Sequence, residues 1–239
     1  MSSPGHEFWA RLAELDAEIE RQPAHVRRAL GARWAESGRG EHASVASFGR
    51  FALALLAAAA PPELVEAAHR AALDEIHHAR ICFALASRYL GEALGPGPLA
   101  VTGDMLGPFD LEALARATVE EGCVGETLAA LEAEAHRSAA PSAVIQAAWC
   151  IIAADEARHA ELAWSFVRWA IGTGGEPVRA AVSEAFERAL QDVASEPALE
   201  SALGEELAAS GFLDGRARQQ LRLHAVQQVI RPALTELLG

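Results

Sequence analysis

Apolar residues recur along this chain with the spacing of an α-helix, and alternating strand patterns are almost absent. In residues 7–21, the positions Phe8, Leu12, Leu15 and Ile19 form one stripe of a short amphipathic helix. The same period continues through four longer segments and three tail segments, at about residues 23–60, 62–90, 110–138, 141–171, 176–193, 197–209 and 215–238. The pattern therefore predicts an all-α protein.

Proline and capping residues mark the ends of the four longer helices. Pro61 and Pro62 stop the first and open the second, because proline is tolerated only in the first turn of a helix. Asp110 is a good N-cap for the third, and Pro141 opens the fourth. A glycine-rich stretch at residues 172–175 closes the fourth.

The longest connection, residues 91–108, is rich in glycine and proline and divides the four helices into two pairs. A long crossover of this kind joins parallel helices of a four-helix bundle. We therefore expect a single domain over residues 1–239, with an N-terminal helix in 1–29, a bundle in 30–171 and additional C-terminal helices in 172–239.

One stretch of the chain occurs twice, as Ala72–Ile81 and again as Ala153–Leu162. Each copy contains Glu-x-x-His, in which three residues make about 300° of helical turn and place both side chains on one face. The pairs are Glu75 with His78 and Glu156 with His159. Two such helices facing each other would bring two carboxylates and two imidazoles into one small volume.

The repeat also indicates where further ligands belong. The two motifs are offset by 81 residues (156 minus 75), so the partner of Glu41 in the second half should fall near residue 122. Glu121 lies one residue away from that position. The separations of 34 residues (41 to 75) and 35 residues (121 to 156) are each the length of a helix hairpin.

Four carboxylates and two neutral imidazoles balance two divalent cations and leave positions open for a small molecule. Without metal, the carboxylates would repel one another inside an apolar bundle and their pKa values would rise. The set Glu41, Glu75, His78, Glu121, Glu156 and His159 is therefore predicted to bind metal. Asp74 and Asp155 are candidate acceptors that orient a ligand histidine on a neighbouring helix.

The third helix leaves two questions open. Spacing favours Glu121 as the ligand, but Gly122 and Gly125 weaken the helix, and a π-bulge there would bring Glu126 round as a further ligand. The small residues Gly122, Cys123 and Gly125 fit either close helix packing or a pocket for substrate or O2.

Composition narrows the function classes. A formal net charge of −13 disfavours nucleic acid as a partner, since a phosphate binder needs a basic face. The apolar run at residues 51–62 is too short to span a bilayer and no secretory signal is visible, so a cytoplasmic protein without a membrane partner is expected. Cys82, Cys123 and Cys150 form no C-x-x-C pair, which fits reduced thiols and excludes a four-thiolate iron or zinc centre.

The motif set, spread over about residues 30–171, resembles the ferritin-like di-iron carboxylate superfamily. The resemblance implies a left-handed ferritin-like four-helix bundle with two iron ions that react with O2. It also implies that Glu75 and Glu156 bridge the metals, that Glu41 and Glu121 are terminal ligands, and that His78 and His159 bind one metal each. Mn/Fe and Mn/Mn pairs suit the same ligands.

Two functions from this superfamily are compatible with the residues. The first is an O2-activating oxidase or oxygenase acting on a small organic substrate, with electrons from an external donor. The second is a ferroxidase whose substrate is Fe(II). The additional C-terminal helices and the glycine-lined third helix favour the first. A third interpretation is a helical interaction module in which the Glu-x-x-His motifs occur by chance. The resemblance to the family also suggests a homodimer.

Overall fold

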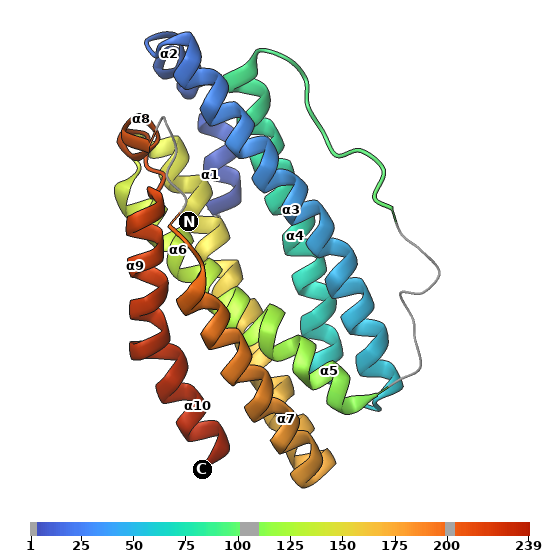
Figure 1. Cartoon of the computed structure of the whole chain (residues 1–239). Helices are drawn as coiled ribbons and strands as arrows, with labels where there is room; N and C mark the ends of the chain where they lie inside the picture. The colour runs from blue at the N-terminus through green and yellow to red at the C-terminus, as the bar shows by residue number, and fades with distance from the viewer. Residues whose placement is uncertain (1–3, 101–109, 199–203) are drawn as a thin grey trace.

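A computed structural model of the chain describes residues 4–100, 110–198 and 204–239. Within these residues the chain is helical without any strand, which confirms the all-α prediction. The elements are α1 (Pro4–Arg11), α2 (Glu14–Glu20), α3 (Ala24–Ala57), α4 (Pro62–Leu90), α5 (Leu111–Ala117), the π-helix η2 (Thr118–Glu126), α6 (Thr127–Ala139), α7 (Ala143–Ser195), α8 (Gly204–Ala209), α9 (Gly215–Ala225), the π-helix η3 (Val226–Ile230) and α10 (Arg231–Leu238) (Figure 1).

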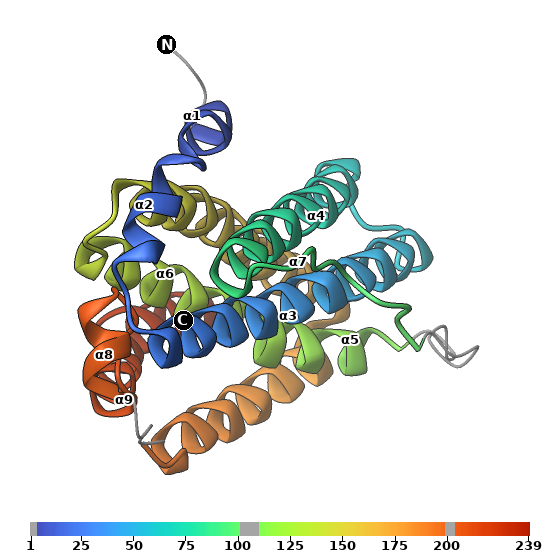
Figure 2. The ribbon, with the colours of Figure 1, turned by 90° about the horizontal axis from the view of Figure 1, so that it is seen from above.

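Helices α3 and α4 form an antiparallel hairpin and lie side by side in both ribbon views (Figures 1 and 2). Pro62 begins α4, and Gly91, with a φ of 73°, ends it in the left-handed conformation that glycine adopts without strain. The glycines at residues 38 and 40 do not interrupt α3. At Gly38 an added Cβ would lie 3.1 Å from the Phe83 ring, so this glycine allows the two helices to approach closely.

The third predicted helix is a composite of α5, η2 and α6. The Asp110 side chain caps α5 by accepting hydrogen bonds from the backbone N–H groups of Glu112 and Ala113, as the sequence predicted. The middle of the helix then widens into the π-helical turns of η2 before α6 resumes the α geometry. This widening changes which side chains face the rest of the bundle.

Helix α7 consists of two helical segments that meet at Gly175, where φ is 64° and ψ is −145°. Trp164 in the first segment and Phe186 in the second stack with ring centroids 5.2 Å apart, so the second segment folds back along the first. The predicted glycine-rich break thus exists, although the first segment continues beyond Ile171.

The ends of the chain pack around this framework. The single helix predicted for residues 7–21 is two helices, α1 and α2, separated at residues 12–13, and its apolar stripe is buried as predicted. Helices α9 and α10 lie beside α6 and α7 (Figure 1). Of the predicted crossover, residues 91–100 are neither helix nor strand, and residues 101–108 lie outside the described residues. The segment predicted at 197–209 is described only as α8 and its flanks.

The buried apolar residues form two clusters, one toward each end of the long helices. On α4, Ala71 belongs to one cluster and Ile81 to the other, and both Glu75 and His78 lie between them. The same alternation occurs on α7, where Ile152 and Leu162 flank the second motif. The polar motifs therefore sit at mid-length, with an apolar cluster on each side.

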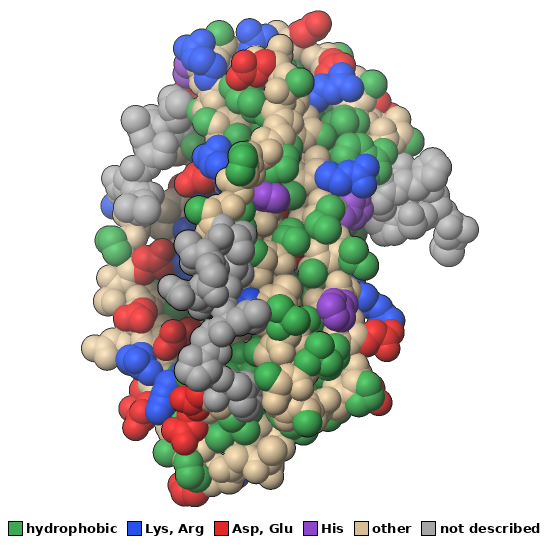
Figure 3. Space-filling view, turned by 90° about the vertical axis from the view of Figure 1, so that its right-hand side faces the viewer, with side chains coloured by type: hydrophobic (Ala, Val, Ile, Leu, Met, Phe, Trp, Pro, Cys, Tyr) green, Lys and Arg blue, Asp and Glu red, His purple; other side chains and the backbone are tan. Residues whose placement is uncertain are grey.

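At its Glu75–His78 motif, helix α4 buries a carboxylate and an imidazole and exposes two apolar neighbours. Leu73 and Ile76 are 65% and 45% exposed, whereas Glu75 and His78 are buried. The face drawn in Figure 3 correspondingly mixes apolar, charged and histidine side chains. Among the described residues, no helix combines the length and the apolar character that a membrane crossing requires.

Candidate metal centre

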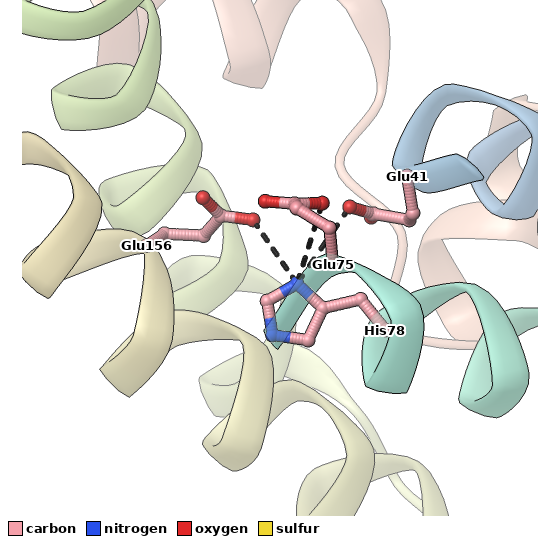
Figure 4. Close-up of side chains that lie close together, drawn as sticks. All are labelled: Glu41, Glu75, His78 and Glu156. Atoms are coloured by element: carbon pink, nitrogen blue, oxygen red, sulfur yellow. Dashed lines mark ion pairs between the residues drawn. The ribbon is translucent and has the colours of Figure 1, made fainter. Parts of the chain in front are cut away.

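Side chains from α3, α4 and α7 converge at the middle of the molecule. Glu41, Glu75, His78 and Glu156 each offer one ligand atom, and these atoms all lie within 4.8 Å of one another (Figure 4). A second group with the same property adds the end of η2 and consists of Glu126, Glu156 and His159. Because Glu156 belongs to both groups, they form one continuous cluster.

The two imidazoles point their Nδ1 atoms at the same pair of carboxylates. His78 Nδ1 lies 3.5 Å from Glu156 Oε1, 3.9 Å from Glu75 Oε2 and 3.7 Å from Glu41 Oε2 (Figure 4). His159 Nδ1 lies 3.2 Å from Glu75 Oε1 and 3.2 Å from Glu156 Oε2. Glu75 and Glu156 therefore occupy bridging positions between the histidines.

Each motif supplies an aspartate to the histidine of the other motif. His78 Nε2 lies 3.0 Å from Asp155 Oδ2, and His159 Nε2 lies 3.4 Å from Asp74 Oδ2. The sequence predicted this role for both aspartates. An imidazole whose Nε2–H donates to a carboxylate keeps Nδ1 directed at the opposite side, here the centre of the cluster.

Burial shifts the pKa values of the carboxyl groups. Removal from water is the main cause that raises the pKa of Glu75 to about 8 and that of Glu126 to about 11, and the negative charge of Glu156 adds to both. Burial alone would also raise the pKa of Glu156, but hydrogen bonds with His159 and Glu126 outweigh it and lower that pKa. In the absence of metal, protons therefore take the place of cations on Glu75 and Glu126.

The histidines shift in the opposite way to ordinary buried imidazoles. Burial opposes a charged ring, yet the nearby carboxylates of Asp155 and Glu41 raise the pKa of His78 to about 10. Against the same penalty, Glu156 and Glu75 raise the pKa of His159 to about 9. Both rings carry positive charge near neutral pH in the metal-free protein, because the surrounding carboxylates attract it.

The cluster fits a metal by geometry and by its unsatisfied atoms. Two ligand atoms at right angles around a cation about 2.1 Å away are about 3 Å apart, close to the 3.2 Å spacings around His159 Nδ1. Glu75 Oε2 and His78 Nδ1 are buried without a hydrogen-bond partner, which is costly unless another group binds them. The described residues thus include a buried Glu/His group suited to cations.

Glu121 is not brought into this cluster. Its side chain is 62% exposed and lies 3.5 Å from an arginine on α3, Arg50. Glu120 is also exposed and pairs with Arg188. Because η2 is π-helical, the register of the third helix changes, and Glu126 is the residue that joins the cluster. The spacing argument assumed an unbroken α-helix and selected a glutamate that lies outside the cluster, whereas the alternative based on a π-bulge selected Glu126, which lies in it.

The small residues of the third helix have unequal surroundings. At Gly122 an added Cβ would lie 2.5 Å from Ala163 Cβ, so close packing of η2 on α7 accounts for this glycine. At Gly125 the nearest atom would be the Glu120 carbonyl oxygen at 3.3 Å. Cys123 is buried in an apolar cluster, and desolvation raises the pKa of its thiol.

Two neighbours of the cluster were not identified from the sequence. Phe48 packs against the His159 ring with centroids 4.9 Å apart, and Arg158 contacts both Asp74 and Asp155. Phe48 lies seven residues after Glu41, on the same face of α3, and Arg158 lies inside the second motif. These two sequence positions could have indicated that both residues lie near the cluster.

Comparisons with known protein families, with characterised proteins and with solved structures find no match for this chain.

Proposed function

We propose that this protein is a ferritin-like di-iron carboxylate protein whose cluster binds two iron ions. Glu75 and Glu156, which lie near both histidines, would be shared by the two ions, and His78 and His159 would each hold one. Glu41 would be the terminal ligand beside His78, and Glu126, in place of Glu121, would be the terminal ligand beside His159. The observation that carries the proposal is the convergence of four carboxylates and two imidazoles from four helical segments. Two of their buried atoms, Glu75 Oε2 and His78 Nδ1, have no hydrogen-bond partner.

The proposed activity is O2-dependent oxidation of a small organic substrate. Iron held by these residues would supply the redox chemistry toward O2, with electrons from an external donor. Apolar clusters on both sides of the site exclude water, which favours a controlled reaction over release of oxidants. Asp74 and Asp155 orient the imidazoles, and Glu75 and Glu126 release their protons when they bind metal.

A ferroxidase is the second candidate. Glu41 is 18% exposed, more than the other residues of its group, and thus offers a carboxylate at the edge of the site where Fe(II) can enter. The same ligands then serve iron as the substrate rather than as the resident cofactor. The two functions differ in whether oxidation stops after the site is filled.

The test is anaerobic loading with Fe(II), metal quantitation, and rapid mixing with O2 followed optically. Two irons per chain and a single phase of oxidation that stops after one filling support the oxidase. Continued conversion of added Fe(II) into ferric product supports the ferroxidase. Absence of stoichiometric metal contradicts both and favours a helical interaction module.

A further inference from the structure

A single guanidinium joins the outer hydrogen bonds of both imidazoles. Arg158 Nη2 lies 2.5 Å from Asp155 Oδ1 and 3.1 Å from Asp74 Oδ2. These are the two carboxylates that contact the Nε2 atoms of His78 and His159 through Oδ2. The chain of contacts from one histidine to the other therefore runs through one nitrogen atom of Arg158.

The two halves of the repeat are not equivalent at this position. In the first copy the residue before the ligand histidine is His77, whose ring lies 6.4 Å from the ring of Trp9 on α1. In the second copy it is Arg158, which is held in place by a further hydrogen bond from Nη1 to the Ala154 carbonyl oxygen. Arg158 thus serves both copies of the motif.

An exposed ion pair is usually worth little to stability, and the Arg158 side chain is 53% exposed. Arg158 can nevertheless control the orientation of the carboxylate that it contacts. The Asp155 side chain is only 12% exposed and contacts His78 with one oxygen and Arg158 with the other, so the guanidinium fixes the rotation of that carboxylate. The rigid planar fork of arginine suits this task better than a flexible ammonium.

We propose that Arg158 is a positioning residue for both metal-binding histidines. By fixing Asp74 and Asp155, it holds His78 and His159 with Nδ1 directed at the metals. This inference rests on the proposed metal centre, and it assigns the two halves of that centre a common support outside the ligand shell.

The test uses Co²⁺ as the probe, because its visible spectrum reports ligand geometry as well as binding. Arg158→Gln removes the charge and the fork, whereas Arg158→Lys keeps the charge. Arg168→Gln is the matched control, since Arg168 lies on the same helix, is exposed and has a distant partner in Glu236 at 3.9 Å. We expect Arg158→Gln to weaken Co²⁺ binding by about 10- to 100-fold and to alter the spectrum. Arg158→Lys should bind more tightly than Arg158→Gln, and the control should match the wild-type protein.

Unchanged Co²⁺ affinity and spectrum in Arg158→Gln would overturn the inference. If the wild-type protein itself binds no Co²⁺, the proposed metal centre fails, and Arg158 is then judged on the metal-free protein. There, NMR should show faster exchange with water of the Nε2–H protons of His78 and His159 in Arg158→Gln than in the wild type. Equal exchange rates would reject the positioning role independently of metal.

Discussion

Glu75 and Glu156 each face both imidazoles, whereas Glu41 lies beside His78 and Glu126 is grouped with His159. The cluster thus has two shared carboxylates and one terminal carboxylate for each histidine. At the scale of single residues, this division is the structural basis of the proposed di-iron centre. It also distinguishes two glutamates that are close in sequence, because Glu121 is a surface residue and Glu126 is a proposed ligand.

The exchange of Glu121 for Glu126 is directly testable. Glu126→Ala should bind fewer than two irons per chain, because it removes the terminal carboxylate grouped with His159. Glu121→Ala is the matched control on the same element, and we expect full metal content because that side chain is exposed and pairs with Arg50 on the surface. Iron quantitation after anaerobic loading and desalting provides the measurement. The reverse result, loss of iron in Glu121→Ala alone, would restore the ligand that the spacing suggested.

Metal affinity should rise with pH. Glu75, His159, His78 and Glu126 have pKa values raised to about 8, 9, 10 and 11, so all four carry protons in the metal-free protein near neutral pH. Each proton released on binding makes the apparent affinity about tenfold higher per pH unit while the pH remains below the pKa of that group. Titrations with Co²⁺ between about pH 6 and pH 8 should therefore show steeply tighter binding and proton release into weak buffer. Affinity independent of pH would contradict the protonated state of the cluster.

At the scale of secondary-structure elements, the helical period predicted where helices begin and end, whereas the π-helical turn and the contacts between helices depended on local geometry. Helix α4 spans the predicted residues, and the Asp110 cap and the break near Gly175 lie where the sequence placed them. The π-helix η2 was only an alternative, since glycines permit both geometries and tertiary packing selects one. Pairing of Asp74 and Asp155 with histidines followed from their positions, but the contact of Arg158 with both needed the actual spacing of α4 and α7.

Close packing of η2 on α7 leads to a prediction about stability. In Gly122→Ala, the new methyl group would lie 2.5 Å from Ala163 Cβ, so the helices must move apart. We expect a loss of about 1–3 kcal/mol in the free energy of unfolding, as is typical of overpacked sites. Gly49→Ala on α3 is the control, because no atom lies within 4 Å of its added Cβ, and it should gain up to about 1 kcal/mol. Denaturant unfolding of both variants decides, and equal stabilities would refute the packing account of Gly122.

At the scale of the whole molecule, the candidate centre joins helical segments that belong to different parts of the chain. It lies between the two apolar clusters and draws ligands from α3, α4, η2 and α7. In the metal-free protein, the raised pKa values of Glu75 and Glu126 keep both carboxyl groups protonated. The cluster also contains buried atoms without hydrogen-bond partners. Cations that replace those protons should therefore connect the two helix pairs and stabilise the fold as a whole.

Thermal unfolding should reveal this connection. A metal at 100 times its dissociation constant stabilises the folded state by about 2.7 kcal/mol, which corresponds to a rise in Tm of roughly 5–10 °C for a chain of this size. We expect that rise when the chelated protein is loaded with Fe(II) without O2. Glu126→Ala should show a smaller rise and Glu121→Ala the full one. An unchanged Tm in the wild-type protein would mean that metal does not bind the folded core.

The most direct test of the central claim is iron-edge anomalous diffraction from crystals loaded anaerobically with Fe(II). We predict two strong anomalous peaks between Glu75 and Glu156, one beside His78 and the other beside His159. Crystals that show no iron in this cluster, or iron only at surface carboxylates, would contradict the assignment of a di-iron centre to these residues.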